Sequence, residues 1–450
     1  MTMKKLRWAM DGEFWELDLS TPATLDGVAR PVGRGLPLPL GLSRGTRLSR
    51  PKQIDFLQRF MAAPLVPSFS DGLGLSLQRL LPLPLPSSAR DACFTSLLGQ
   101  FNVQQFAASL KGSESIWRQL SDPQFYALNF CWEWLITPQD TLLLTSEAHA
   151  HDKIPRKKAI LHHKFPNHNL TVEASSPALF VDDGGNYWDV PFTLAMDVAS
   201  IAPRSATSCH FCINHNAGSP RQRSLSSPIP PPTLLPGLSA KSAISFNKNF
   251  HIWKSHAPKA RMVQPYDILL SNPHVSASAM LGTVVTASLG ENSTSQDEPF
   301  KLCAKGANYA ASADLFASAS LSAQLGNFQK PFLDLTRFHA RLDIPSASKF
   351  LNGASKVAQA LNNSQPPSVE AIQAITPSAT LSFQQQMAGP FSLRIDSGVC
   401  VDMKKDWYLN VNDPVFAVEY ALHVLASAKA VAWYSPKQRE FMIELRFFET

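Results

Sequence analysis

Basic side chains gather in one stretch of the chain, SRGTRLSRPKQIDFLQRF (residues 43–60). From residue 27 to residue 60 there are seven lysines and arginines and one acid, and this difference, 7 − 1 = +6, equals the formal net charge of the whole chain. A guanidinium group donates paired hydrogen bonds to phosphate oxygens, and its weak hydration lets it lie at an interface. The stretch therefore predicts contacts with an anionic headgroup, for which the candidate residues are Arg44, Arg47, Arg50, Lys52 and Arg59.

An amphipathic helix is expected directly after Arg50, the third of these arginines. Pro51 suits a first helical turn and Pro64 suits the end of the helix, while Ile54, Leu57 and Phe60 share one face. A basic stretch joined to such a helix is typical of binding to an anionic membrane surface. The alternative is a solvated basic loop that pairs with acids elsewhere in the chain. Nucleic acid is disfavoured, because neither aromatic interleaving nor a recognisable binding fold accompanies the charge.

Two short motifs resemble catalytic or metal sites but lack the partners that such sites need. GLSRG (residues 41–45) matches a nucleophile elbow, yet the preceding PLPLPL cannot form a central strand because proline lacks the N–H group. Cys209 and Cys212 with His215 have no second ligand pair, and in a strand the two cysteines point to opposite faces. Glycine-rich phosphate loops are absent. We therefore predict a protein that is not an enzyme and has no metal and no cofactor.

The composition favours strands over helices. Charged residues make up 17% of the chain and 35 of its residues are proline, which argues for strands separated by proline-rich turns. No apolar run is long enough for a membrane-spanning helix. The first twenty residues lack an apolar core and contain four acids, so we expect no secretory signal and no cleaved transit peptide, and six reduced cysteines.

The chain divides into three parts. Residues 1–90 are irregular, basic and rich in proline, with one helix candidate; residues 91–125 form a short mixed or helical connector; residues 126–450 form an antiparallel sheet. From about residue 126 apolar and polar residues alternate, which is typical of strands. A helical insertion interrupts them near residues 346–376. The alternating segments are LNFCWEWLI (128–136), VPFTLAMDVAS (190–200), ISFNKNFHI (244–252), DLFASASLSAQL (314–325), TRFHARLDI (336–344), FAVEYALHV (416–424) and the C-terminal EFMIELRF (440–447).

Alternation alone does not decide whether the apolar face of this sheet meets a protein core or lipid. Several segments reach 9 to 12 residues, the length that a tilted membrane strand needs. Residues 336–344 place ionisable side chains at consecutive positions of one face, as a polar lumen would. Aromatic residues near strand ends could form an interfacial girdle; these are Trp132, Trp134, Tyr187, Trp188, Trp407, Tyr408, Trp433 and Tyr434. A soluble sandwich and a membrane barrel both remain open on these patterns.

Longer strings identify a family. They are GLSRGTRLSRPKQ, RFMAAPLVPSFS, SLLGQF, HNLTVEA, YWDVP, PPPTLLPGLSAKSA, LGNFQKPFLDLTRFHARLD and YSPKQREFMIELRFFET. On these strings the chain resembles, from about residue 4 to residue 450, the trigalactosyldiacylglycerol 4 family of plant chloroplasts. The resemblance implies a mainly β fold, a large antiparallel membrane β-barrel in the chloroplast outer envelope, distantly similar to bacterial lipopolysaccharide-export barrels.

The same resemblance implies a function. Members of the family bind phosphatidic acid, form homodimers and take part in the import of lipids made in the endoplasmic reticulum, with an inner-envelope ABC-type lipid importer as partner. Phosphatidic-acid binding is attributed to the N-terminal region, which here contains Arg44 to Arg59. A second binding segment before the barrel is represented here only by Lys111 and Arg118. The alternative function is an outer-envelope channel for solutes or proteins without specific lipid binding.

Inside such a barrel, Arg337, His339 and Arg341 are possible headgroup contacts. The arginines could equally pair with Asp343 and neighbouring acids. The helix at residues 350–361 and the N-terminal segment are interpreted as plugs, which disfavours an open channel. The last strand is expected to pair with residues 128–136 and so to leave no edge in the lipid.

Overall fold

The structure is a computed structural model of the full chain. It describes residues 30–31, 65–70, 74–83, 93–110, 116–149, 155–181, 187–200, 207–222, 230–253, 273–289, 301–303, 309–325, 336–344, 346–388, 391–402, 408–421, 428–436 and 439–447. Strands dominate these residues and all of their pairings are antiparallel, which confirms the predicted mainly β class and the large antiparallel sheet.

Consecutive strands pair in chain order around the sheet. The first part contains β2 (Val66–Ser70), β3 (Gly74–Pro82), β4 (Cys93–Asn102), β5 (Tyr126–Leu135), β6 (Asp140–His149), β7 (Arg156–Lys164) and β8 (His168–Ser176). The second contains β11 (Phe192–Ser200), β12 (Thr207–Ala217), β14 (Gly237–His251), β15 (His274–Leu289), β17 (Tyr309–Leu325) and β18 (Thr336–Ile344), with β16 (Lys301–Cys303) also paired to β17. The third contains β19 (Ser378–Ala388), β20 (Phe391–Asp402), β21 (Tyr408–Ala421), β22 (Ala428–Ser435) and β23 (Glu440–Phe447).

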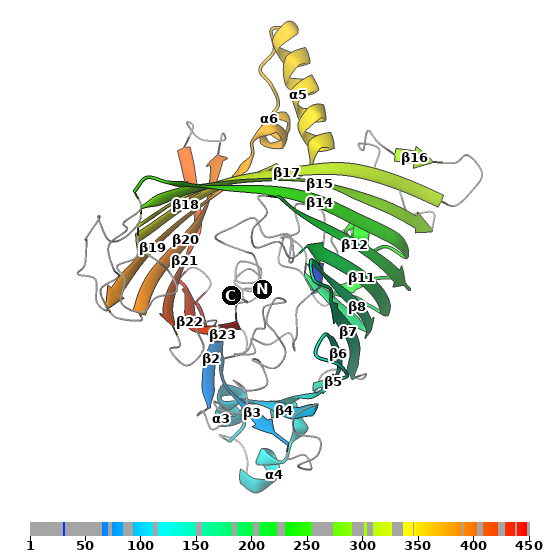
Figure 1. The fold of residues 1–450 in the computed structure, drawn as a ribbon, viewed down its shortest axis with the longest axis vertical. Coiled ribbons are helices and arrows are strands. Elements are labelled where there is room, and N and C mark those ends of the chain that lie inside the picture. The colour runs from blue at the N-terminus through cyan, green and yellow to red at the C-terminus, as the bar shows by residue number, and fades with distance from the viewer. Residues whose placement is uncertain are drawn as a thin grey trace.

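The order of pairing returns to its start. β23 pairs with β2 at Phe69 and Phe441, and Figure 1 shows the strands following one another around a ring. The predicted pairing of the last strand with residues 128–136 is wrong, because β5 lies between β4 and β6. The strands before β5 escaped prediction for a physical reason. β2 and β3 carry Pro67 and Pro82, and β4 buries three consecutive residues from Phe94 to Ser96, which hides the alternation.

In the predicted connector, residues 91–125, the first part forms strand β4 and short helices follow it. They are α3 (Val103–Leu110), α4 (Ile116–Leu120) and the 3-10 turn η2 (Pro123–Phe125). Phe106 of α3 packs on Phe101 and Phe125, with ring centroids 5.2 and 5.7 Å away, so α3 lies against the neighbouring strands. In the described part of the chain, no helix combines the length and the apolar character needed to cross a membrane.

The predicted helical insertion is confirmed as α5 (Ala347–Asn362) and α6 (Val369–Ile375). Ser346 caps α5 by accepting a hydrogen bond from the Lys349 amide, and its hydroxyl donates to Asp314 of β17 at 2.5 Å. Gly353 lets α6 approach closely, since a Cβ there would lie 2.7 Å from Ala374. The helix pair projects away from the ring in Figure 1, so the interpretation of this helix as a plug is wrong.

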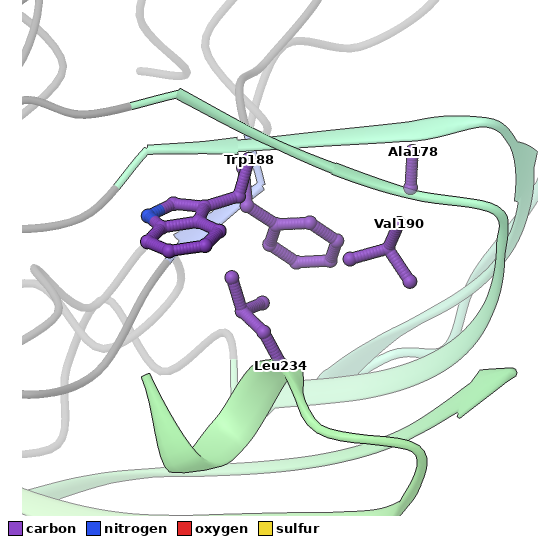
Figure 2. Packing of buried hydrophobic residues seen from close by; sticks show 5 residues of the cluster. Ala178, Trp188, Val190 and Leu234 are labelled. Carbon is purple, nitrogen blue, oxygen red and sulfur yellow. The ribbon is translucent and has the colours of Figure 1, made fainter. Parts of the chain in front are cut away.

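A second, small sheet accompanies the large one. Its strand order is β1 (Arg30–Pro31), β9 (Ala178–Val181), β10 (Tyr187–Val190) and β13 (Arg221–Gln222). Figure 2 shows Trp188 and Val190 packed with Leu234 of the turn η3 (Pro232–Leu234), and these side chains are buried. Arg156 of β7 forms an ion pair with Asp189 of β10 and so joins the two sheets.

Candidate functional site

The N-terminal lipid site predicted from the sequence lies outside the residues that the structure describes. This applies to Arg44, Arg47, Arg50, Lys52, Arg59 and also to Lys111. Arg118 is described: it is exposed on α4 beside Trp117, whose side chain is 79% exposed. Binding at these positions stays a prediction, and the geometry that follows concerns the wall of strands.

One face of the wall is apolar and exposed, whereas the other is buried and carries most of the polar side chains, together with apolar groups such as Met280 and Phe316. On β5, Phe130 and Trp132 are 40% and 41% exposed, and their neighbours Asn129 and Glu133 are 5% and 1% exposed. The same inversion recurs around the ring. The exposed apolar residues include Leu81, Leu128, Trp134, Leu161, Phe192, Leu194, Met196, Leu238, Ile244, Phe246, Leu281, Leu315, Leu321, Phe338, Leu342, Leu381 and Val418. A sheet of a water-soluble protein buries its apolar face, so this pattern is the reverse of the usual one.

The structure brings the three predicted lumen residues together on the buried face of β18. Arg337, His339 and Arg341 are 7%, 3% and 8% exposed. Arg337 Nε donates to Ser322 Oγ at 3.0 Å across the β17–β18 ladder. Arg341 Nε lies 2.7 Å from Asp343 Oδ1, which confirms the alternative in which Arg341 pairs with Asp343.

A second ionic group continues along the same face. Arg394 of β20 is fully buried; its Nη1 lies 3.2 Å from Glu419 Oε1 and its Nε 2.7 Å from Asp396 Oδ2. Its guanidinium carbon lies 5.0 Å from the centroid of the Trp433 ring, which places the cation over an aromatic face. Gln384 Nε2 donates to Glu419 Oε2 at 3.0 Å. Gln384 stands opposite both Arg337 and Arg394 in the ladders and so lies between the two groups.

We call this set the inner-wall cluster: Arg337, His339, Arg341, Asp343, Gln384, Arg394, Asp396 and Glu419. Its three guanidinium groups are matched by three carboxylates. Such a cluster offers polar contacts to a ligand only in exchange for contacts that it already makes. It is therefore suited to lining a polar interior more than to holding one anion tightly.

The cysteine–histidine motif forms no metal centre in the described residues. Cys209 and Cys212 lie three residues apart on β12 (Thr207–Ala217). Cys209 is exposed, whereas the Cys212 thiol lies 3.6 Å from Asn214 Oδ1, so the prediction that the two cysteines face opposite sides is confirmed.

Of the described residues predicted to form an aromatic girdle, some are exposed and others are buried, and their position at a membrane interface stays a prediction. Trp132 and Trp134 are exposed, and their rings stack with centroids 6.5 Å apart; Tyr434 is 46% exposed. Trp188 and Trp433 are wrong as girdle residues, because they are 3% and 0% exposed. The first packs in the small sheet, and the second lies on the buried face below Arg394. Trp407 lies outside the described residues.

Sequence reasoning missed Gln384 and Arg394, and it assigned Trp433 to the aromatic girdle instead of the buried face. The ladder between β19 and β20 shifts register between Gln386 and Ala388, and that between β20 and β21 shifts between Asp396 and Gly398. Both shifts come after Gln384 and Arg394 in their strands, so they shorten the alternating runs to residues 378–386 and 391–396 without changing the face on which these two residues lie. The available signal was the spacing of two between Arg394 and Asp396, which places opposite charges on one face.

Comparison with known proteins gives one full-length relative. The chain is 50% identical over 484 aligned positions to the protein TRIGALACTOSYLDIACYLGLYCEROL 4, chloroplastic, of Arabidopsis thaliana, and the alignment covers 100% of both chains. No family model matches the chain.

Proposed function

Because the chain belongs to the trigalactosyldiacylglycerol 4 family, we propose that it is a lipid-transfer β-barrel of the chloroplast outer envelope membrane. In this role it binds phosphatidic acid and takes part in the import of lipids made in the endoplasmic reticulum. The relative is described as chloroplastic, and its name contains that of a galactolipid. These descriptions support a location in the chloroplast and a role connected with lipid.

One observation carries the membrane part of this proposal. The apolar face of the wall is exposed and the polar face is buried, as the pairs Phe338/His339 and Trp132/Glu133 illustrate. Exposed apolar surface of this extent is costly in water but favourable in hydrocarbon. A cyclic order of antiparallel pairing also satisfies most of the backbone groups that a bilayer cannot hydrate, the exception being the short junction between β2 and β23.

The basic stretch supplies the headgroup specificity in this proposal. Phosphatidic acid carries a phosphomonoester with a charge between −1 and about −2 near neutral pH, by analogy with other phosphomonoesters. Arg44, Arg47 and Arg50 stand three residues apart, with Lys52 and Arg59 following, and can share such a group. Homodimer formation and an ABC-type lipid importer of the inner envelope complete the proposed pathway.

Liposome flotation tests the headgroup assignment. Replacing Arg44, Arg47 and Arg50 together with alanine should weaken flotation with vesicles that contain phosphatidic acid far more than with neutral vesicles. The matched control replaces Lys349 and Lys356, two exposed cations of α5, and should leave flotation unchanged. Equal flotation of the triple variant and the unaltered protein would contradict the assignment.

The alternative function is a solute or protein channel. The argument that the α5 helix closes the interior no longer stands, since this helix projects away from the ring. Conductance in planar bilayers distinguishes the two functions: a lipid-transfer protein should give no steady ion current, whereas an open channel should give one.

A further inference from the structure

The wall has one short seam, between β2 and β23. In the described residues these strands are paired at the single position Phe69–Phe441. By contrast, all eight residues of β23 have a partner in β22, and all five residues of β2 have a partner in β3. Each seam strand is therefore held by its own neighbour and only weakly by the other.

The sequence of β2 explains the short pairing. The strand has five residues, VPSFS, and one of them is Pro67. Proline cannot donate to a strand ladder and is found in edge strands. Separating β2 from β23 therefore breaks fewer ladder hydrogen bonds than separating β22 from β23 would break.

The two sides of the seam have opposite chemistry. On the outer side Phe69, Leu81 and Tyr434 are 37%, 42% and 46% exposed. On the inner side Ser76 and Gln100 are buried, and Gln100 Nε2 donates to Ser76 Oγ at 2.9 Å. An opening here would connect an apolar exterior directly with a polar interior.

We infer that the β2–β23 seam opens laterally and serves as the portal through which a phospholipid enters or leaves the wall. The acyl chains stay on the apolar outer side while the headgroup lies on the polar inner side. With a continuous wall, a phospholipid would have to move its charged headgroup through hydrocarbon, which is costly because the charge loses its hydration. Alternatively, it would have to move its acyl chains past the buried polar groups, which is costly because apolar surface then meets a polar interior. The inference rests on the proposed lipid-transfer function and specifies its route.

The position of the basic stretch along the chain supports this portal. Arg59 precedes Val66, the first residue of β2, by seven residues. Seven residues span at most about 25 Å when fully extended. Arg59, the basic residue of the stretch that is nearest to β2 along the chain, is thus tethered within about 25 Å of the seam.

A reversible cross-link tests the portal. In a variant whose six native cysteines are replaced by serine, Phe69→Cys and Phe441→Cys place two thiols directly across the seam. Directly opposite residues of an antiparallel pair lie about 4.5 or 5.5 Å apart between Cα atoms, within the range that a disulfide bridges. The matched control, Ala432→Cys with Ile443→Cys, cross-links β22 to the same strand β23, where pairing is already continuous. The assay is transfer of fluorescent phosphatidic acid from phosphatidylcholine donor vesicles to phosphatidylcholine vesicles that hold the reconstituted protein.

We expect oxidation of the seam variant to lower transfer to the rate of protein-free vesicles, and reduction to restore it. The oxidised control should keep its rate. Transfer by the cross-linked seam variant at the rate of the cross-linked control, or an equal loss in both, overturns the portal. Absence of transfer by both reduced variants and by the unaltered protein would instead contradict the lipid-transfer function on which the portal rests.

Discussion

An arginine substituted on the outer face tests whether this face meets lipid or water, because the two surroundings predict different losses of stability. Leu281 is the eighth of the sixteen residues of β15 and is 60% exposed; its outward partner on β14 is Ile244, 61% exposed. Leu238 is the second residue of β14 and is 49% exposed. The two leucines therefore match in exposure and strand environment, and differ mainly in their position along the wall.

The expected cost of Leu281→Arg follows from this position. Leu238 lies six residues from the middle of β14, which is about 20 Å along the strand and about 14 Å along the membrane normal at a tilt of about 45°. The apolar band of an outer-membrane-type barrel is about 25 Å tall, so Leu238 lies near its edge and Leu281 near its centre. Arginine costs about 2–4 kcal/mol at the centre and about 0–1 kcal/mol near the interface. In water, both exposed substitutions should stay within about 0.5 kcal/mol of the parent.

The assay is equilibrium unfolding by urea of the protein in phosphatidylcholine vesicles, followed by tryptophan fluorescence. Leu281→Arg should lower the free energy of unfolding by about 2 kcal/mol or more relative to Leu238→Arg, which is about 30-fold in the folding equilibrium. Equal stability of the two variants would refute the assignment of this face to lipid. A protein that stays monomeric in buffer without detergent would refute it as well.

Two further substitutions test the wall itself by urea unfolding. Gly282→Ala should lower the free energy of unfolding by about 1–3 kcal/mol, because the new Cβ would lie 2.1 Å from the Phe316 ring. Phe316→Leu in the same chain should recover part of this loss, and no recovery would contradict the steric explanation. Glu419→Gln keeps the shape of the side chain but removes a charge paired with buried Arg394, so we expect the free energy of unfolding to fall by about 3–5 kcal/mol. A loss smaller than that of an exposed substitution would show that Asp396 alone satisfies Arg394.

The alternation of β5 and β18 was predictable from the sequence because these strands have no bulge and carry their polar residues at strict intervals of two. Whether the apolar face meets lipid or a protein core was not predictable, because apolar and polar residues alternate with a period of two in both kinds of sheet. The first strands were lost to prolines, and Gln384 and Arg394 of the inner-wall cluster were missed because their alternating runs are short and end at the register shifts near Gln386 and Asp396. Helical spacing identified α5 but could not give its direction, which is set by the contacts of Ser346 and Ser348 with Asp314.

The inner-wall cluster also bears on where an anionic headgroup is selected. Arg341 is paired with Asp343, and Arg394 with Asp396 and Glu419, so a phosphate must displace a carboxylate before it gains a guanidinium. This exchange replaces one charge-assisted hydrogen bond by another and leaves little net gain. The basic stretch at residues 43–60 has one acid among its own cations. We therefore propose that phosphatidic acid is selected at the N-terminal stretch and that the wall makes a weaker, transient contact. A transfer route needs this weakness, because a ligand held tightly at an intermediate point would not leave it.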